Sequence, residues 1–122
     1  MFNRKHAAMA RRKMSHVLDE VYTAMFHYGG KEVSLRIIRE ENGLHLLGQG
    51  DFSPEHRQDM ERMAELLSPA IRNPALVEAY WELAGGDQYT SDSEMSLVGQ
   101  MIDRAHVEVG ENTVTLDLFL AF

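Results

Sequence analysis

The chain has 122 residues, of which 44% are hydrophobic and 25% charged, a composition typical of one globular domain large enough to bury a core. The net charge of −7 argues against broad nucleic-acid binding, which depends on neutralising phosphates, and no apolar run approaches the roughly 20 residues of a membrane span. The absence of cysteine excludes disulfides, cysteine-ligated zinc and thiol catalysis. Together with the lack of an apolar leader it favours a cytoplasmic location.

The sequence predicts one long helix over residues 4–28, because helix-favouring residues continue without a break up to the glycine pair at 29 and 30. Residues 1–16 are interpreted as a basic helical extension and residues 17–122 as the domain. Five cations precede the first acidic residue, Asp19: Arg4, Lys5, Arg11, Arg12 and Lys13. This arm is either a solvated extension or a contact for nucleic acid, anionic lipid or an acidic partner.

Two stripes run along this helix. The apolar stripe, expected to be buried, holds Val17, Leu18, Val21, Met25 and Tyr28. The polar stripe holds His16, Glu20, Thr23 and His27, and it is either the solvated side or a ligand-facing surface. Histidine and carboxylate side chains suit zinc, but residues 16 and 27 lie about 16 Å apart along a helix. Only a neighbouring pair such as His16 and Glu20 can meet at one ion, and the pair needs a further ligand from elsewhere.

Two β-hairpins follow from alternating apolar residues and turn signals. The first joins residues 31–39 to 44–47 through Glu41-Asn42-Gly43, after which residues 48–51 break the pattern. The second joins residues 105–109 to 113–120 through Gly110-Glu111-Asn112. The side chains predicted to face the helices are Val33, Leu35, Ile37, Val107, Val109, Leu116 and Leu118. The opposite face is predicted to carry Arg36, Glu108, Thr115 and Asp117, with Ile38, Leu47, Phe119, His45 and His106 among them.

Three helices are expected between the hairpins. Ser53-Pro54 opens the first, Asn73-Pro74 the second, and the capping box from Ser91 to Glu94 the third, which runs to about residue 103. In the second helix, Tyr80 and Trp81 are adjacent and cannot both face the core squarely. Either one of them, with Tyr89 beyond, lies in an exposed interaction patch, or Trp81 is buried and Tyr80 half-covered. The element order predicts an α+β fold, a two-layer α/β sandwich whose mainly antiparallel sheet of two hairpins carries the helices on one face.

This order of elements resembles the histidine-kinase-like ATPase superfamily, known as the GHKL or Bergerat fold. Residues 18–29, LDEVYTAMFHYG, are similar to the N box of that family, L-x-E-x-x-x-N-A-x-x-H-G. Residues 97–109, LVGQMIDRAHVEV, are similar to its last helix and first closing strand, and residues 113–116 to its last strand. The resemblance covers nearly the whole chain from about residue 17, and it is nearest to the compact branch of anti-sigma-factor serine kinases.

The nucleotide-binding motifs of that family are degenerate in this chain. Glu20 matches the N-box glutamate that activates water in hydrolysing members, whereas Ala24 stands where an asparagine holds magnesium. Asp51, in Gly48-Gln49-Gly50-Asp51, corresponds to the aspartate that reads adenine, with its glycines in a different order. Near residues 92–95 the phosphate-binding glycines are missing and two acidic residues stand instead.

The resemblance therefore implies a fold that has been kept and an ordinary ATP chemistry that has been lost. We expect a non-catalytic regulatory or protein-interaction module in signalling or transcriptional control, with no cofactor and no metal, a protein partner and a homodimer. The dimer is expected to use the sheet face away from the helices, which the N-terminal helix could also cover. The alternative is an ATP–magnesium-binding protein or anti-sigma-type serine kinase with altered contacts through Glu20 and Asp51.

Overall fold

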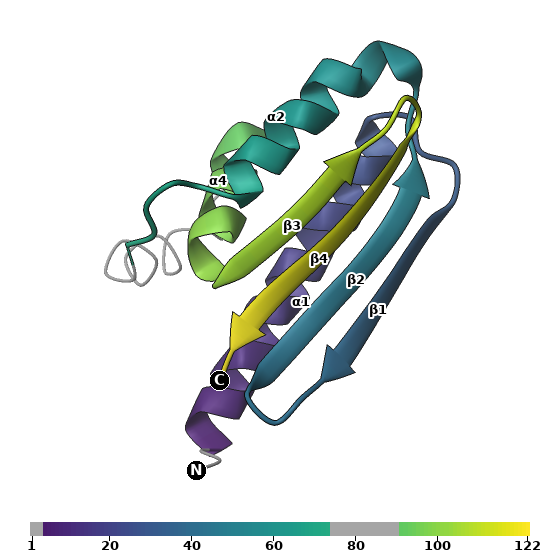
Figure 1. Cartoon of the computed structure of the whole chain (residues 1–122). Coiled ribbons are helices and arrows are strands. Elements are labelled where there is room, and N and C mark those ends of the chain that lie inside the picture. Colours follow the sequence, from purple (N-terminus) through teal and green to yellow (C-terminus); the bar gives the residue numbers. More distant parts are fainter. Residues whose placement is uncertain (1–3, 74–90) are drawn as a thin grey trace.

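The computed structural model describes residues 4–73 and 91–122. Its elements are α1 (Arg4–His27), β1 (Val33–Arg39), β2 (Gly43–Asp51), the 3₁₀ turn η1 (Pro54–His56), α2 (Arg57–Leu67), α4 (Ser91–Met101), β3 (Arg104–Val109) and β4 (Thr113–Ala121). The four strands form one antiparallel sheet in the order β1-β2-β4-β3 (Figure 1). The predicted α+β sandwich of two hairpins is confirmed.

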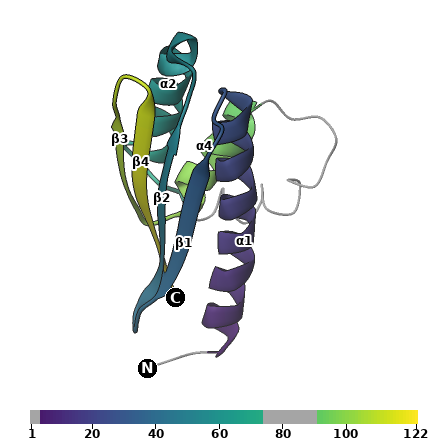
Figure 2. The ribbon, with the colours of Figure 1, turned by 90° about the vertical axis from the view of Figure 1, so that its right-hand side faces the viewer.

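The helical layer lies on one face of the sheet, with α1 running along the strands (Figure 2). The shared core contains Met14, Val17, Val21 and Met25 of α1, Met60, Met63 and Leu67 of α2, Val98 and Ile102 at α4, and Leu46, Leu116 and Leu118 of the sheet. None of the described helices combines the length and the apolar character that crossing a bilayer requires.

Helix α1 is one continuous element, and no break separates residues 4–16, the described part of the predicted basic extension, from the rest. Ala10 and Met14 are each 2% exposed and belong to the same core as Val17, because the apolar stripe extends toward the N-terminus. The expectation that this helix could cover the outer sheet face is wrong, since its apolar stripe is already buried against the inner face. Gly29 ends the helix with a φ of +90°, and the Gly30 amide donates to the Met25 carbonyl, as in a Schellman motif.

Several predicted boundaries differ in the structure. Strand β2 continues through residues 48–51, because Gly48 leaves room for the side chains of Leu35 and Leu116 on either side of it. Pro54 opens η1 as predicted, but the Ser53 side chain makes no capping hydrogen bond. Residues 74–90, including the predicted patch at Tyr80 and Trp81, and the capping contact of Ser91 lie outside the described part of the chain.

The predicted sheet faces agree with the structure, and two side chains, Ile37 and Phe119, are exceptions only in their exposure. Leu116 and Leu118 are buried, and Val33, Leu35, Val107 and Val109 pack against the core. Ile37 pairs with buried Leu46 but is itself 48% exposed, because β1 is the edge strand and α1 lies mainly over β2. Ile37 therefore lies on the helix-facing side as predicted, but the helices leave it exposed at the edge of the sheet.

Phe119 is the second exception. It lies on the outer face as predicted, yet it is only 6% exposed. The Arg104 guanidinium lies 4.4 Å from the centre of its ring, and the His45 ring lies 4.7 Å away, centre to centre. The outer face therefore covers its largest apolar side chain with its own polar neighbours, and Ile38 and Leu47 are half-buried.

Candidate functional site

The polar stripe of α1 divides into a solvated part and a part that contacts another helix. Thr23 and His27 are exposed, as expected of a solvated side. His16 and Glu20, one turn apart, are partly buried against α4, and the side chain of His16 is only 19% exposed. The solvated interpretation is therefore wrong for His16 and Glu20.

The helix α4 supplies a third side chain to this place. Glu94, in its first turn, is 4% exposed, and its Oε2 lies 3.2 Å from Nε2 of His16. One ligand atom from each of His16, Glu20 and Glu94 can be chosen such that all three lie within 4.8 Å of one another. These residues, here called the His16–Glu20–Glu94 cluster, join two elements that are more than 70 residues apart in the sequence.

The electrostatic environment of the cluster disfavours the state in which Glu20 and Glu94 are both ionised. Burial and then the neighbouring Glu94 carboxylate raise the pKa of Glu20, against a smaller lowering by His16. The positive end of the α4 helix dipole favours an anion at Glu94 in the first turn. The arrangement thus presents one imidazole and two carboxylates to the same small volume, a donor set that suits a cation.

Asp51, the other predicted site residue, holds a loop of the backbone through hydrogen bonds. Its Oδ1 accepts hydrogen bonds from the backbone amides of Lys31 (2.8 Å) and Glu32 (3.0 Å), which fix the loop between α1 and β1. The Glu32 amide and then the Lys31 amide hold the pKa of this carboxyl below its ordinary value. The structure thus places Glu20 with His16 and Glu94, and Asp51 at a turn of the backbone.

Two positions matched to the family's magnesium and phosphate sites, Ala24 and Met95, belong to the hydrophobic core. Ala24 is 8% exposed and packs in the core, and Met95, near the expected phosphate loop, is 4% exposed. Both positions point toward the core, away from a solvent-filled site.

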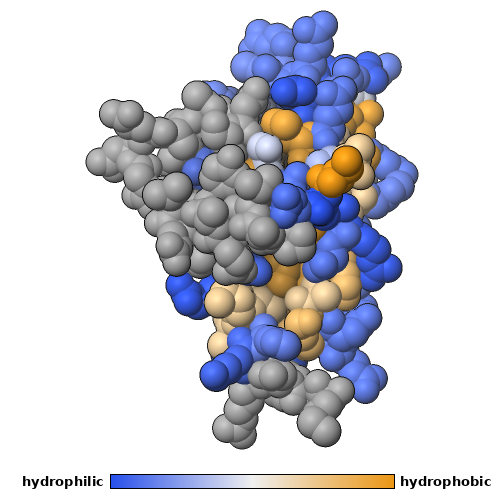
Figure 3. Space-filling view, turned by 90° about the vertical axis from the view of Figure 1, so that its left-hand side faces the viewer, coloured by the Kyte–Doolittle hydropathy of each residue, from blue (hydrophilic) through white to orange (hydrophobic). Residues whose placement is uncertain are grey.

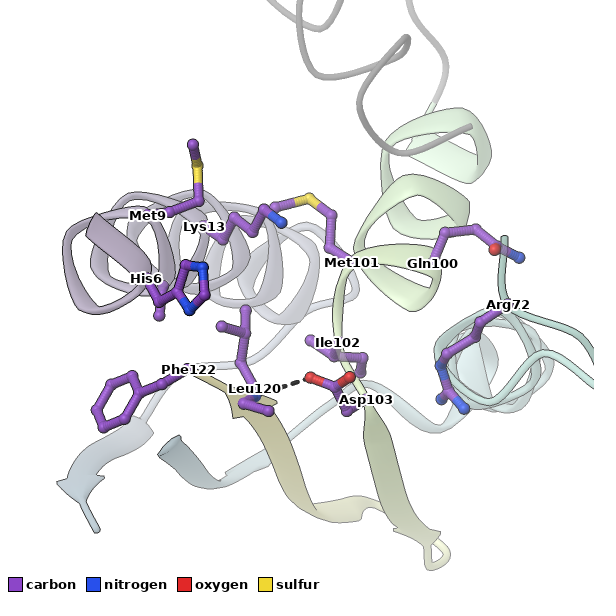
Figure 4. A pocket seen from close by; sticks show the side chains of 12 residues that line it. His6, Met9, Lys13, Arg72, Gln100, Met101, Ile102, Asp103, Leu120 and Phe122 are labelled. Carbon is purple, nitrogen blue, oxygen red and sulfur yellow. Dashed lines mark hydrogen bonds between the residues drawn. The ribbon is translucent and has the colours of Figure 1, made fainter. Parts of the chain in front are cut away.

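A hollow of about 310 Å³ lies between α1, the end of α4 and the C-terminal end of β4 (Figure 4). Met9 and Lys13 of α1 and Met101 of α4 line one side of it, and Asp103 accepts a hydrogen bond from the Ala121 amide on the other. In the space-filling view of this side, apolar side chains reach the surface toward the N-terminal end of α1 (Figure 3). None of the three cluster residues lines this hollow, which adjoins the C-terminal end of α4, whereas Glu94 lies in the first turn of that helix.

Glu94, the third side chain of the cluster, is the residue that the sequence did not reveal. The pair His16 and Glu20 was visible from the helical spacing, whereas Glu94 was interpreted as a capping-box residue. Glu94 follows Ser91-Asp92-Ser93 in a polar first turn, so nothing in the sequence distinguished it from a solvated capping residue. Comparisons with protein-family models, with curated proteins and with solved structures find no match to this chain.

Proposed function

We propose that this chain is a non-catalytic regulatory or protein-interaction module with the histidine-kinase-like ATPase fold. The observation that carries the proposal is Ala24, which stands at the magnesium-ligand position and lies 8% exposed in the core. Its methyl group has no ligand atom, and it belongs to the same hydrophobic core as Val21 and Met25.

The charge of the neighbouring residues supports the same proposal. Glu20 and Glu94 bring two carboxylates to the side of α1 where the family's N box would face the phosphates. A triphosphate placed there meets like charges unless a cation intervenes. Two cationic side chains of the described residues, Lys13 and Arg72, line the separate hollow toward the N-terminal end of α1.

The partner surface that we propose is the flank of α1 opposite to His16 and Glu20. Tyr22 (41% exposed) and Phe26 (49%) are one turn apart there, and their rings meet edge to face with centres 6.3 Å apart. On a helix this flank points away from α4, toward the side of the sheet where edge strand β1 carries Ile37 (48%). These three are among the most exposed large apolar side chains of the described residues, and exposed aromatic pairs of this kind are typical of interfaces.

A second copy of the chain is the proposed occupant of this surface. Edge strand β1 has one side that is not paired within the sheet, whereas β3, the other edge, contacts α2, where the Ser68 hydroxyl donates to the Ala105 carbonyl at 3.4 Å. A two-fold dimer is the commonest closed assembly, and it would bury both aromatic pairs together.

Sedimentation equilibrium tests this surface. We expect the intact chain to be a dimer at micromolar concentrations and Phe26→Lys to be a monomer, because the substitution places a charge within the apolar contact. His27→Lys, the neighbouring exposed position on the opposite flank, is the matched control and should remain a dimer. A wild-type monomer at about 100 µM, or a dimer that persists in Phe26→Lys, would contradict the homodimer.

A further inference from the structure

The His16–Glu20–Glu94 cluster has the geometry of a cation site rather than that of a simple ion pair. Glu94 is 4% exposed, and within the described residues its Oε2 accepts no hydrogen bond, although Nε2 of His16 lies 3.2 Å away. A buried carboxylate oxygen normally has a hydrogen-bonding partner, because leaving it without one is costly. Oε2 of Glu94 points into the space that it shares with His16 and Glu20.

The charge of the cluster also favours a bound cation. With a neutral imidazole, the two carboxylates carry a charge of about −2 in a partly buried place, where their repulsion is poorly screened. A protonated His16 offsets only half of this charge. A divalent cation offsets all of it and uses an imidazole nitrogen and two carboxylate oxygens as ligands.

The distances agree with coordination of one ion. Two ligand atoms that are each about 2.0–2.1 Å from a tetrahedral zinc ion are about 3.3 Å apart, close to the 3.2 Å between His16 Nε2 and Glu94 Oε2. The remaining pairs, at up to 4.8 Å, require the Glu20 side chain to move inward by up to about 1.5 Å, which its rotatable bonds permit.

We propose that His16, Glu20 and Glu94 bind one divalent transition-metal ion, for which zinc is the first probe. Imidazole with carboxylate ligands favours zinc, manganese, iron and cobalt over calcium or magnesium, which prefer oxygen ligands alone. The ion would link the middle of α1 to the first turn of α4, two elements held otherwise by apolar packing. This inference does not depend on the proposed dimer, because Tyr22 and Phe26 lie on the opposite flank of α1.

The experiment uses the intact chain, freed of metal with a chelator and then titrated with Zn²⁺ or Co²⁺. We expect one ion per chain and a melting temperature raised by about 10 °C at a free-metal concentration of about one hundred times Kd. Cobalt should give visible absorption bands in the wild type, reporting nitrogen and oxygen ligands directly.

Matched variants locate the site. In Glu94→Gln and Glu20→Gln the affinity should fall by about 100-fold or more, with loss of the cobalt bands. Both variants should remain folded in chelator, with a melting temperature equal to or above that of the wild type, because each removes a repelling carboxylate. His27→Ala, which removes a histidine from the same helix outside the cluster, should bind as the wild type does.

Three results would overturn the proposal: no saturable binding of one ion per chain, binding that both glutamine variants retain, or binding that is lost equally in His27→Ala. The cluster is a structural ion pair if both glutamine variants are less stable than the wild type in chelator and the wild type and the variants all fail to bind metal.

Discussion

Replacement of Leu116 by aspartate is expected to unfold the domain. Leu116 is 4% exposed in central strand β4, where it pairs with Gly48 on one side and Val107 on the other and faces the helices. Removing a buried leucine costs about 2–5 kcal/mol, and an unpaired buried carboxylate adds several more. The sum is comparable with the whole stability of a small domain, about 5–15 kcal/mol.

The control for this variant is Gln49→Asp. Gln49 is an exposed residue of the other central strand, β2, and lies opposite Ser34 and Thr115, so that no acidic residue faces the new charge directly. Circular dichroism and a thermal melt should show cooperative unfolding for Gln49→Asp and none for Leu116→Asp. A Leu116→Asp protein that melts cooperatively near the wild-type temperature would show that the face assignment of β4 is incorrect.

The second large effect is expected at Gly99, where alanine should destabilise the protein. In an ordinary helix, glycine to alanine is favourable by about 0.5–1 kcal/mol. Gly99 lies where α4 crosses the end of α2, and a Cβ there would overlap the carbonyl oxygen of Leu66, a backbone atom that cannot rotate away. The Arg72 Nε donates to the Gly99 carbonyl at 3.0 Å and its Nη2 to the Leu67 carbonyl at 3.3 Å, so the same crossing is held from a second direction.

We therefore expect Gly99→Ala to lose about 1–3 kcal/mol of unfolding free energy in urea, against the sign of helix propensity. Ser96→Ala, at a half-buried position of the same helix, provides the control, because it gains helix propensity without adding a side-chain atom against the Leu66 carbonyl and should be neutral or slightly stabilising. A Gly99→Ala protein as stable as Ser96→Ala would mean that the two helices are not in close contact at this point.

The comparison of sequence with structure shows where local patterns suffice. Alternation along residues 105–109 and 113–120 predicted the second hairpin and the buried faces of Leu116 and Leu118, because a strand's two faces follow from its period alone. The same rule gave the correct face for Ile37 but not its exposure, since alternation cannot indicate which strand forms the edge of the sheet. It likewise gave the outer face for Phe119 but not its burial, which depends on Arg104 and His45 from the two neighbouring strands.

Only part of the candidate site could be predicted from the sequence. His16 and Glu20 are one turn apart on α1, a local relation that the sequence shows directly. Glu94 joins them through the packing of α4 on α1, a long-range relation that no spacing in the chain expresses. For Asp51 the family resemblance implied an adenine-reading role, and the structure shows that its carboxylate accepts hydrogen bonds from the backbone amides of Lys31 and Glu32.

The central claim, that the domain does not turn over ATP, is tested most directly by phosphate release from ATP and magnesium. We expect the purified intact chain to release phosphate no faster than buffer, and ATP or ADP with magnesium to leave its melting temperature unchanged, because Ala24 offers no ligand to the ion. Glu20→Ala is the required companion, since Glu20 matches the residue that would activate water. Phosphate release above background that disappears in Glu20→Ala would contradict the account and would favour an ATPase or serine kinase with altered nucleotide contacts.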